Sequence, residues 1–433
     1  MSAPIRLALD GGPPCLATSY VARWPDDPGP DGLLSLEAMT GHSLGQGPTQ
    51  TVRRLERRWS DATGRAHVVA CRSVTAAARL AAASLEIGAG DEVICPVDAA
   101  GVSLAFTAVS QTIPVFVDLD PQTLHIDPAA VDAAITERTR AILAVDLYGA
   151  TADYRALDEL ARRHDLVVLE DGSQSLGATF EHRPVGALGA ASFCALPTDS
   201  CSAPGAAALY TTDDDQQAAN ARRILLVSDD FGLQQPFASF GAGMGWSYRI
   251  SELDAIAADG YLGRLEHEVA VRSANGRHLR RQLSELAGIW MPDIVRGASP
   301  VYSSFPVLVQ PDELGLPETA ATALRDTLID CTTAEGLWMD RSQPQPMTGA
   351  TNSDELRPFE GAFTRTASPR RADYPVADAM WAAGLVLGHT RSPFNPPHST
   401  RAMDRIADCF TKILVDNVDR LCQLTIDRMR TTP

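Results

Sequence analysis

Between about residues 66 and 212, short apolar segments alternate with segments of helical spacing, and this alternation limits the fold more than any other feature. The expected strands are residues 67–71, 92–95, 114–118, 141–145, 166–170, 191–194 and 207–210, and the expected helices are 75–85, 128–135 and 156–164. A helix between two strands favours parallel pairing, because it returns the chain to the same edge of the sheet. The pattern predicts an α/β fold whose large domain holds a mostly parallel sheet with helices on both faces.

The sequence on either side of this region has other patterns. Residues 12–48 are rich in Gly, Pro and Asp and predict an extended arm. Residues 251–286 predict one long helix that starts with a serine–aspartate capping pattern. Beyond it, a strand and two helices are predicted at 302–309, 317–335 and 399–428. We expect two domains, 1–250 with the arm and the large sheet, and 251–433 with the long helix and a smaller α+β domain.

The charge balance excludes some classes of partner. The 54 acidic residues outnumber the 37 basic ones and give a formal net charge of −17. Nucleic acids and anionic membranes are bound by basic surfaces, so we expect neither as a partner. The sequence shows no signal segment and no run long enough to span a membrane, which predicts a cytoplasmic protein. The 8 cysteines form no CxxC pair, and we expect no metal site.

Lysine is nearly absent from the chain. Of the 37 Lys and Arg residues, Lys412 is the only lysine. A mechanism that needs a lysine amine therefore has a single candidate. Lys412 falls in the last predicted helix, where we expect a solvated side chain on the outer face of the small domain rather than a catalytic group.

Five runs of sequence occur together in one order: LEIGAGDEVI (85–94), PVFVDLD (114–120), LYGATAD (147–153), LEDGSQSLGATFEHRPVG (169–186) and GWSYRISEL (245–253). As a set they resemble the DegT/DnrJ/EryC1/StrS family of sugar and aminocyclitol aminotransferases. The segments 7–13 and 45–58 are similar to the cyclitol-type branch of that family. The resemblance covers nearly the whole chain and implies the aspartate-aminotransferase fold of pyridoxal-phosphate enzymes.

The resemblance gives family roles to two residues after the strand 166–170. Asp171 matches the carboxylate that pairs with the pyridinium nitrogen, and Gln174 matches the residue near the phenolic oxygen of the cofactor. A turn-forming aspartate and a surface glutamine are the alternative interpretations. Asp199 stands where the family has the lysine that forms the internal aldimine, and a carboxylate cannot form an imine. Asp171 and Asp199 are therefore the catalytic candidates.

Five further residues match positions of the family's cofactor pocket, which here is either a vestigial pyridoxal-phosphate pocket or a substrate pocket: Ser73, Thr75, Ala100, Cys194 and Ser247. Ser73 and Thr75 begin the helix that holds the phosphate in the family. Ala100 replaces the aromatic residue that stacks on the ring, and Cys194 replaces a hydroxyl. Ser247 replaces the asparagine that a neighbouring subunit lends. The changes together indicate a site that has moved away from the family's chemistry.

Three charged residues are candidates for contacts with a substrate: Arg72, Asp98 and Asp146. An arginine that points into the pocket binds a phosphate or a carboxylate through two hydrogen bonds, although a solvated arginine is the alternative for Arg72. Carboxylates gathered around Asp171 can raise one another's pKa values and act as general acid and base. They can equally bind the hydroxyl or ammonium groups of an amino sugar or aminocyclitol.

These residues lead to three hypotheses about function. The first is an enzyme of sugar or aminocyclitol biosynthesis that acts on a small molecule without a lysine–cofactor Schiff base and with no covalently bound cofactor. The second is a non-catalytic pseudo-aminotransferase that serves as a partner subunit. The third is a dehydratase-like enzyme that binds pyridoxal or pyridoxamine phosphate non-covalently. The single lysine argues against an ordinary aminotransferase. We expect the protein to form a homodimer or a heterodimer with a paralogue.

Overall fold

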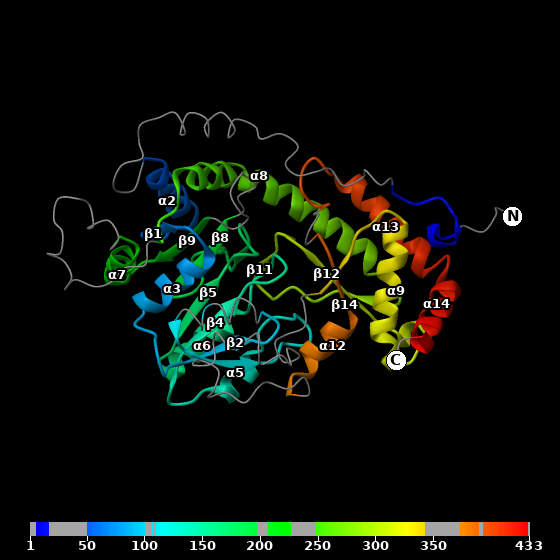
Figure 1. The fold of residues 1–433 in the computed structure, drawn as a ribbon, viewed down its shortest axis with the longest axis horizontal. Helices are drawn as coiled ribbons and strands as arrows, with labels where there is room; N and C mark the ends of the chain where they lie inside the picture. The colour runs from blue at the N-terminus through cyan, green and yellow to red at the C-terminus, as the bar shows by residue number, and fades with distance from the viewer. Residues whose placement is uncertain are drawn as a thin grey trace.

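A seven-stranded sheet organises the first half of the chain (Figure 1). The computed structural model describes residues 6–16, 50–99, 106, 110–196, 207–226, 248–342, 373–388 and 393–431. The sheet has the order β1-β9-β8-β5-β4-β2-β3, with β1 His67–Cys71, β2 Glu92–Pro96, β3 Ile113–Val117, β4 Thr139–Val145, β5 Val167–Asp171, β8 Ala191–Leu196 and β9 Ala207–Thr212. Every neighbouring pair is parallel except the two that β9 makes with β1 and β8. The predicted mostly parallel sheet is confirmed.

Helices cover both faces of this sheet because successive side chains of a strand point to opposite sides. Val69 and Cys71 of β1 belong to the apolar cluster on one face, and Val68 and Ala70 belong to a cluster on the other. The first face is covered by α3 (Val74–Ser84), α7 (Asp215–Leu226) and α12 (Pro375–Ala383). The second is covered by α2 (Gln50–Thr63), α5 (Pro128–Ala134), α6 (Tyr154–His164) and α8 (Glu252–Leu283).

A smaller antiparallel sheet lies in the second half of the chain. Its order is β10-β12-β14-β13, with β10 Ile289–Trp290, β12 Phe305–Val309, β13 Asp340–Arg341 and β14 Gly384–Leu387. It shares a separate apolar cluster with α9 (Ala321–Ala334), α13 (Thr400–Leu414) and α14 (Val418–Thr431). The seven-stranded sheet precedes residue 250 and this sheet follows it, but the two-domain division at that residue stays a prediction.

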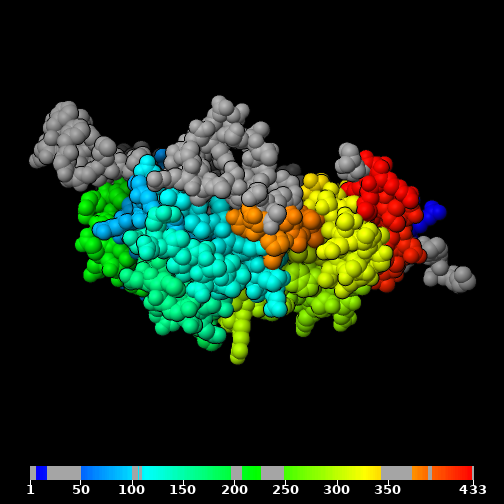
Figure 2. Space-filling view, turned by 90° about the horizontal axis from the view of Figure 1, so that it is seen from below, coloured from blue at the N-terminus to red at the C-terminus, as the bar shows by residue number. Residues whose placement is uncertain are grey.

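The helix α8 and a contact between Asp118 and α12 connect the region of the large sheet to the region of the small sheet. The 32-residue helix α8 crosses the top of Figure 1 and packs against both α2 and α13. Its start is capped as predicted, because Ser251 Oγ accepts a hydrogen bond from Asp254 N at 3.1 Å. The Asp118 carboxylate, after β3, accepts from Val376 N at 2.9 Å and from Ala377 N at 3.0 Å at the start of α12. Figure 2 shows α12 in orange between the cyan surface of the large sheet region and the yellow surface around α9.

The C-terminal region differs from the prediction. The expected single helix over 399–428 is two helices, α13 and α14. Asn417 Nδ2 donates to Lys412 O at 2.8 Å and so satisfies a carbonyl left open where α13 ends. The sequence also does not predict a three-stranded sheet of β6 (Thr179–Phe180), β7 (Arg183–Pro184) and β11 (Ala298–Ser299). Strands of two residues are too short to produce a periodic pattern.

None of the helices in the described ranges combines the length and apolar character that a membrane crossing requires. Within the same ranges, no three or more His, Cys, Asp or Glu side chains gather in a way that could hold a metal ion.

Candidate active site at the carboxyl edge of the large sheet

Four aspartates lie where strands of the seven-stranded sheet end. Because β2, β3, β4 and β5 are parallel, their carboxyl ends meet at one edge of the sheet, which we call the carboxyl edge. Asp98 comes shortly after β2, Asp118 and Asp146 directly follow β3 and β4, and Asp171 is the last residue of β5. Ligands of open α/β sheets bind at this edge.

Asp171 has one carboxylate oxygen engaged and one open. The side chain is buried, with 1% exposed. Its Oδ1 accepts hydrogen bonds from Ser173 N, at 2.9 Å, and from Ser173 Oγ, which itself accepts from Ala195 N at 3.0 Å. Oδ2 is buried and meets no hydrogen-bond partner in the described part of the chain. Burial raises the pKa of Asp171 to about 6, although the Ser173 hydrogen bonds oppose the rise. An oxygen in this state fits a cationic N–H group of a ligand.

The preceding residue, Glu170, is the opposite case. It is fully buried, yet both of its carboxylate oxygens are engaged. The backbone N–H groups of Gly186 and Leu188 donate to it at 2.6 and 2.8 Å, and Ser192 Oγ donates as well. Glu170 therefore anchors the loop between β7 and β8, whereas Asp171 offers an oxygen to a ligand.

Asp98 is buried at the carboxyl edge with both carboxylate oxygens unsatisfied among the residues that the structure describes. Burial raises its pKa to about 7, and the nearby charge of Asp118 adds to the rise. Asp98 also contributes to the raised pKa of Tyr148, which places that phenol in the same surroundings. The Asp98 carboxyl group can thus hold a proton close to neutral pH.

The two carboxylate oxygens of Asp146 differ: one is hydrogen-bonded to the protein, and the other has no partner among the described residues. Its Oδ1 accepts from Ala152 N at 3.0 Å and from Tyr154 OH at 3.2 Å, which fixes the loop between β4 and α6. Its Oδ2 is buried without a partner in the ranges described. Burial raises the pKa of Asp146 well above its ordinary value, and the charges of Glu170 and Asp171 contribute. Asp146 and Asp171 are joined through the backbone, since Asp146 N donates to Asp171 O at 3.0 Å.

The helix α3 begins at the same edge. Both β1 and β8 pair antiparallel with β9, so β1 runs parallel to β8 and its carboxyl end also lies there. Ser73 caps α3, with Oγ accepting from Ala76 N at 3.2 Å, and Thr75 is exposed in the first turn. The backbone N–H groups of such a helix start attract anions. Arg72 is exposed just before the cap, and its backbone N donates to Tyr248 O at 2.8 Å.

A cavity of about 280 Å³ opens beside Asp171. Ser173 and Gln174 line it from the segment after β5, and Arg272 lines it from α8. Ser303 and Ser304 face it from the turn before β12. Ser173 also bonds to Oδ1 of Asp171, so this one residue connects the cavity wall to that carboxylate. Arg272 and the two serines were not among the predicted site residues.

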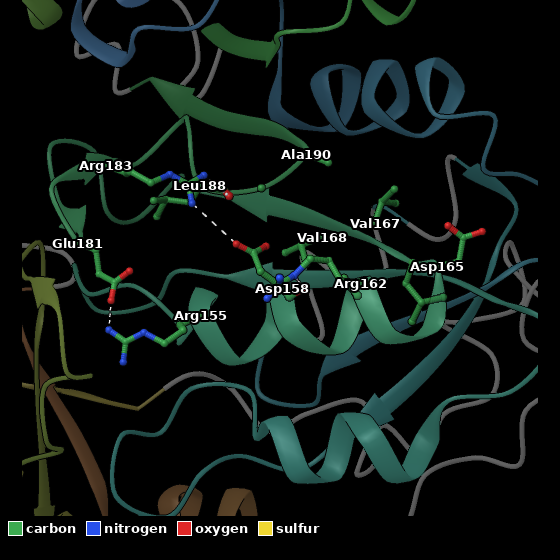
Figure 3. Close-up of a pocket in the computed structure, with 13 residues that line it drawn as sticks. Arg155, Asp158, Arg162, Asp165, Val167, Val168, Glu181, Arg183, Leu188 and Ala190 are labelled. Carbon is green, nitrogen blue, oxygen red and sulfur yellow. Dashed lines mark hydrogen bonds and ion pairs between the residues drawn. The ribbon is translucent and has the colours of Figure 1, made fainter.

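A larger cavity of about 710 Å³ lies against α6 and contains none of the predicted site residues (Figure 3). Four of its charged side chains are paired with one another: Arg155 pairs with Glu181, and Arg183 lies 3.8 Å from Asp158. Arg183 Nη2 also donates to Ala187 O at 2.6 Å. Paired charges of this kind indicate a surface groove rather than a prepared ligand site.

Three predicted site residues, Ala100, Asp199 and Ser247, lie outside the described residues. Cys194 lies in the apolar cluster that β8 and β9 share with α2 and α8, and burial raises the pKa of its thiol well above the ordinary value. Lys412 corrects an expectation. It is 5% exposed rather than solvated, because its Nζ bonds to Glu335 Oε2 and to Pro13 O, both at 2.8 Å.

Sequence reasoning missed Arg272 because many arginines are spread along the helix that contains it. A signal was nevertheless present. Leu265 and Leu279 lie seven residues before and after Arg272, so all three fall on one stripe of α8, and both leucines are buried. A charged residue on the apolar stripe of a helix is a candidate for a functional role.

Comparison with known proteins shows that the chain is similar to aminotransferases. Residues 35–368 match the model of the DegT/DnrJ/EryC1/StrS aminotransferase family. The chain is 32% identical to the L-glutamine:scyllo-inosose aminotransferase of Streptomyces griseus, over 95% of this chain and 98% of the relative. It is also similar to DesV of S. venezuelae in complex with a ketimine intermediate, with a TM-score of 0.72 and 27% identity over 89% of this chain and 94% of DesV. Spr1654 from Streptococcus pneumoniae in its PLP form shares the fold, with a TM-score of 0.72 and 18% identity over 98% of this chain and 99% of that one.

These findings overturn one prediction. The expectation that no cofactor is covalently bound is wrong, because the matched family is an aminotransferase family and the similar structures include a ketimine complex and a PLP form. The described residues fit such a cofactor, since the open Oδ2 of Asp171 suits a pyridinium N–H and the start of α3 suits a phosphate. The predicted aspartate-aminotransferase-like fold is confirmed by the same comparisons.

Proposed function

The chain belongs to the DegT/DnrJ/EryC1/StrS aminotransferase family, and on that basis we propose that it transfers an amino group to the carbonyl carbon of a small cyclitol or sugar. Membership makes it a sugar- or aminocyclitol-aminotransferase-family enzyme of biosynthesis. The relative that matches almost end to end uses L-glutamine by its name, so we propose an amino acid of that kind as donor. The observation that supports the proposal best is the buried, open oxygen of Asp171.

Asp171 and its neighbours would hold the cofactor ring. Bound pyridoxal phosphate supplies an electron sink that stabilises negative charge on the carbon next to its nitrogen. The Oδ2 of Asp171 would accept the ring N–H, and the Ser173 hydrogen bonds to Oδ1 keep the carboxylate in one orientation. The ring N–H would in turn favour the charged form of Asp171, whose pKa is raised by burial and by the nearby charge of Glu170. Gln174, which follows Ser173 along the cavity wall, is proposed to contact the phenolic oxygen.

Ser73, Thr75 and Arg72 are proposed to receive the phosphate at the start of α3. The helix start presents backbone N–H groups, and the exposed hydroxyl of Thr75 adds a donor. Asp98 and Asp146 are proposed to face the substrate, because each keeps at least one unsatisfied carboxylate oxygen within the described part of the carboxyl edge. Asp98 can donate a proton to a substrate hydroxyl or carbonyl near neutral pH, since its pKa is raised to about 7.

Cofactor binding tests the proposal directly. The purified chain is titrated with pyridoxal 5′-phosphate and pyridoxamine 5′-phosphate, and binding is followed by visible absorption. We expect Asp171→Asn to weaken binding by about 10- to 100-fold, because the charge-assisted hydrogen bond to the ring nitrogen is lost. Turnover of L-glutamine with scyllo-inosose should fall at least as much. The matched control is Asp165→Asn, the same change at an exposed residue after α6. Equal affinity in wild type and Asp171→Asn would refute the proposed role.

The link between cofactor and protein is measured separately. The complex is reduced with borohydride, and intact mass and peptide mapping show whether a protein nitrogen carries the cofactor. Any lysine adduct must map to Lys412, the only lysine of the chain, which pairs with Glu335. Turnover without an adduct would support the hypothesis of a reaction without a lysine Schiff base. Bound cofactor without turnover would support the partner-subunit hypothesis, and light scattering tests the proposed homodimer.

A further inference from the structure

Arg272 is a buried cation without a matching anion among the residues that the structure describes. The residue is 7% exposed, and its Nε and Nη2 atoms are buried with no hydrogen-bond partner within the described ranges. The salt bridges of the described chain do not include it, although Glu268 stands one helical turn before it and lies 3.6 Å from Arg264. Burying an uncompensated charge costs several kcal/mol, so proteins rarely keep one without a ligand or partner.

Two serine hydroxyl groups line the same cavity as Arg272, and one of them is without a partner in the described chain. Ser303 and Ser304 line the same cavity of about 280 Å³, and Ser303 Oγ is buried without a partner in the described chain. Tyr261 contacts Arg272: the guanidinium charge and a side-chain hydrogen bond from Arg272 both oppose the burial-driven rise of the Tyr261 pKa. The cavity therefore presents a guanidinium fork and hydroxyl donors, next to the Ser173 that orients Asp171.

The segment that carries the serines is held in one strained position. Tyr302 has a φ of 50°, a left-handed conformation that a bulky residue rarely adopts. Two glycines allow its approach: a Cβ on Gly276 would lie 2.2 Å from the Tyr302 ring, and a Cβ on Gly149 would lie 2.6 Å from Ser303 N. Val301 N donates to Gly149 O at 2.7 Å and ties the segment to the loop after β4. Strain that is fixed from several sides is typical of functional sites.

From these groups we infer that Arg272, Ser303 and Ser304 form a carboxylate-binding subsite, which rests on the proposed function and receives the carboxylate of the amino-acid donor. A guanidinium presents two parallel N–H donors that match the two oxygens of a carboxylate. A single cation neutralises one negative charge, which fits a monoanionic carboxylate better than a dianionic phosphate. Binding here would place the donor beside Asp171, because Ser173 lines the cavity and bonds to that carboxylate.

Calorimetric titration of the cofactor-loaded chain tests the subsite. The probes are L-glutamine, 4-aminobutanamide, which is L-glutamine without its α-carboxylate, and inorganic phosphate. We expect Arg272→Gln to bind L-glutamine about 10- to 100-fold more weakly than wild type while 4-aminobutanamide binds both equally. Arg272→Lys should recover part of the affinity, since an ammonium keeps the charge but not the fork. Arg277→Gln, an exposed arginine of the same helix, is the control and should bind L-glutamine like wild type.

Thermal unfolding and kinetics separate a binding role from a structural one. Nε and Nη2 of Arg272 have no hydrogen-bond partner in the described chain, so removing them in Arg272→Gln should not lower Tm beyond the small loss of the contact with Tyr261. KM for L-glutamine should rise while KM for the cyclitol ketone stays constant. Unchanged L-glutamine affinity in Arg272→Gln, or phosphate competing with L-glutamine in wild type but not in Arg272→Gln, would overturn the carboxylate assignment. If wild type binds pyridoxal phosphate and only the Arg272 result fails, the proposed function stands; failure of wild type to bind the cofactor refutes the proposed function itself.

Discussion

The surroundings of Lys412 and the carboxyl edge both bury charged groups, but in opposite ways. In the small-sheet region, Glu335 is fully buried and accepts hydrogen bonds from three donors: Ala8 N at 2.8 Å, Cys15 N at 3.0 Å and Lys412 Nζ at 2.8 Å. Lys412 adds a bond to Pro13 O. Every charge in this group is paired or hydrogen-bonded within the chain. The group holds the N-terminal segment against α9 and α13.

At the carboxyl edge, the charged side chains are only partly hydrogen-bonded or paired. Asp98, Asp146, Asp171 and Arg272 each keep at least one buried polar atom without a partner in the described residues. Such groups destabilise a fold unless something else compensates them. The difference separates the polar groups that stabilise the fold from those that are open to a ligand. Each prediction below changes a residue of one kind or the other.

The largest effect is expected for Lys412→Met. Removing the cation leaves Glu335 charged and fully buried, which should cost about 3–5 kcal/mol of unfolding free energy. Urea denaturation followed by circular dichroism measures the loss. Arg401→Met, an exposed arginine in the first turn of α13, is the control and should change stability by less than about 0.5 kcal/mol. The double variant Glu335→Gln/Lys412→Met should recover part of the loss, and a single variant as stable as the control would contradict the account.

A smaller loss is expected for Glu170→Gln. The amide keeps one acceptor oxygen but points an NH₂ group at donors, among them the N–H groups of Gly186 and Leu188. We expect a loss of about 2–3 kcal/mol by the same denaturation assay. The matched variant is Asp171→Asn, the next residue of β5, whose open oxygen should make its loss much smaller. Equal losses in the two variants would show that the distinction between anchoring and open carboxylates is wrong.

Asp98→Asn is expected to stabilise the chain at neutral pH by about 1–2 kcal/mol. Burial raises the folded-state pKa of Asp98 to about 7 from an ordinary value of 3.8, so the folded chain keeps a proton that the unfolded chain releases. The stability that Asp98 contributes is therefore highest below about pH 4 and is lost as the pH rises toward 7. Urea unfolding between pH 4 and 8 should show the advantage of the variant growing with pH. A difference that stays constant with pH would count against the raised pKa.

The smallest effect is expected in the groove along α6. Arg155→Ala removes an ion pair with Glu181 in which both side chains are largely exposed to solvent. The loss should stay below about 0.5 kcal/mol and shrink further in high salt, because exposed pairs are screened. Cofactor and L-glutamine affinities should not change. A change in either would mean that the large cavity of Figure 3 takes part in binding.

Much of the fold and part of the candidate site could be predicted from residue patterns. The alternation of strands and helices predicted the sheet, and the position of Asp171 after an apolar strand predicted its place at the carboxyl edge. The break between α13 and α14 was missed, although the contact that closes α13 is local: Asn417 Nδ2 donates to Lys412 O, five residues earlier. Lys412 was misjudged as solvated because its partner, Glu335, is distant in sequence. Long-range pairs leave no local signal.

The sequence by itself determined the fold class and the aspartates after the strands, because periodicity and strand ends are local properties of the chain. It also determined that a lysine amine can come only from Lys412. Only the tertiary structure decided which buried charges are compensated. Glu170 and Asp171 are adjacent in sequence, but one is surrounded by donors and the other keeps an oxygen without a partner among the described residues. That difference depends on segments brought together by folding, such as the loop after β7 and the turn at Ser303.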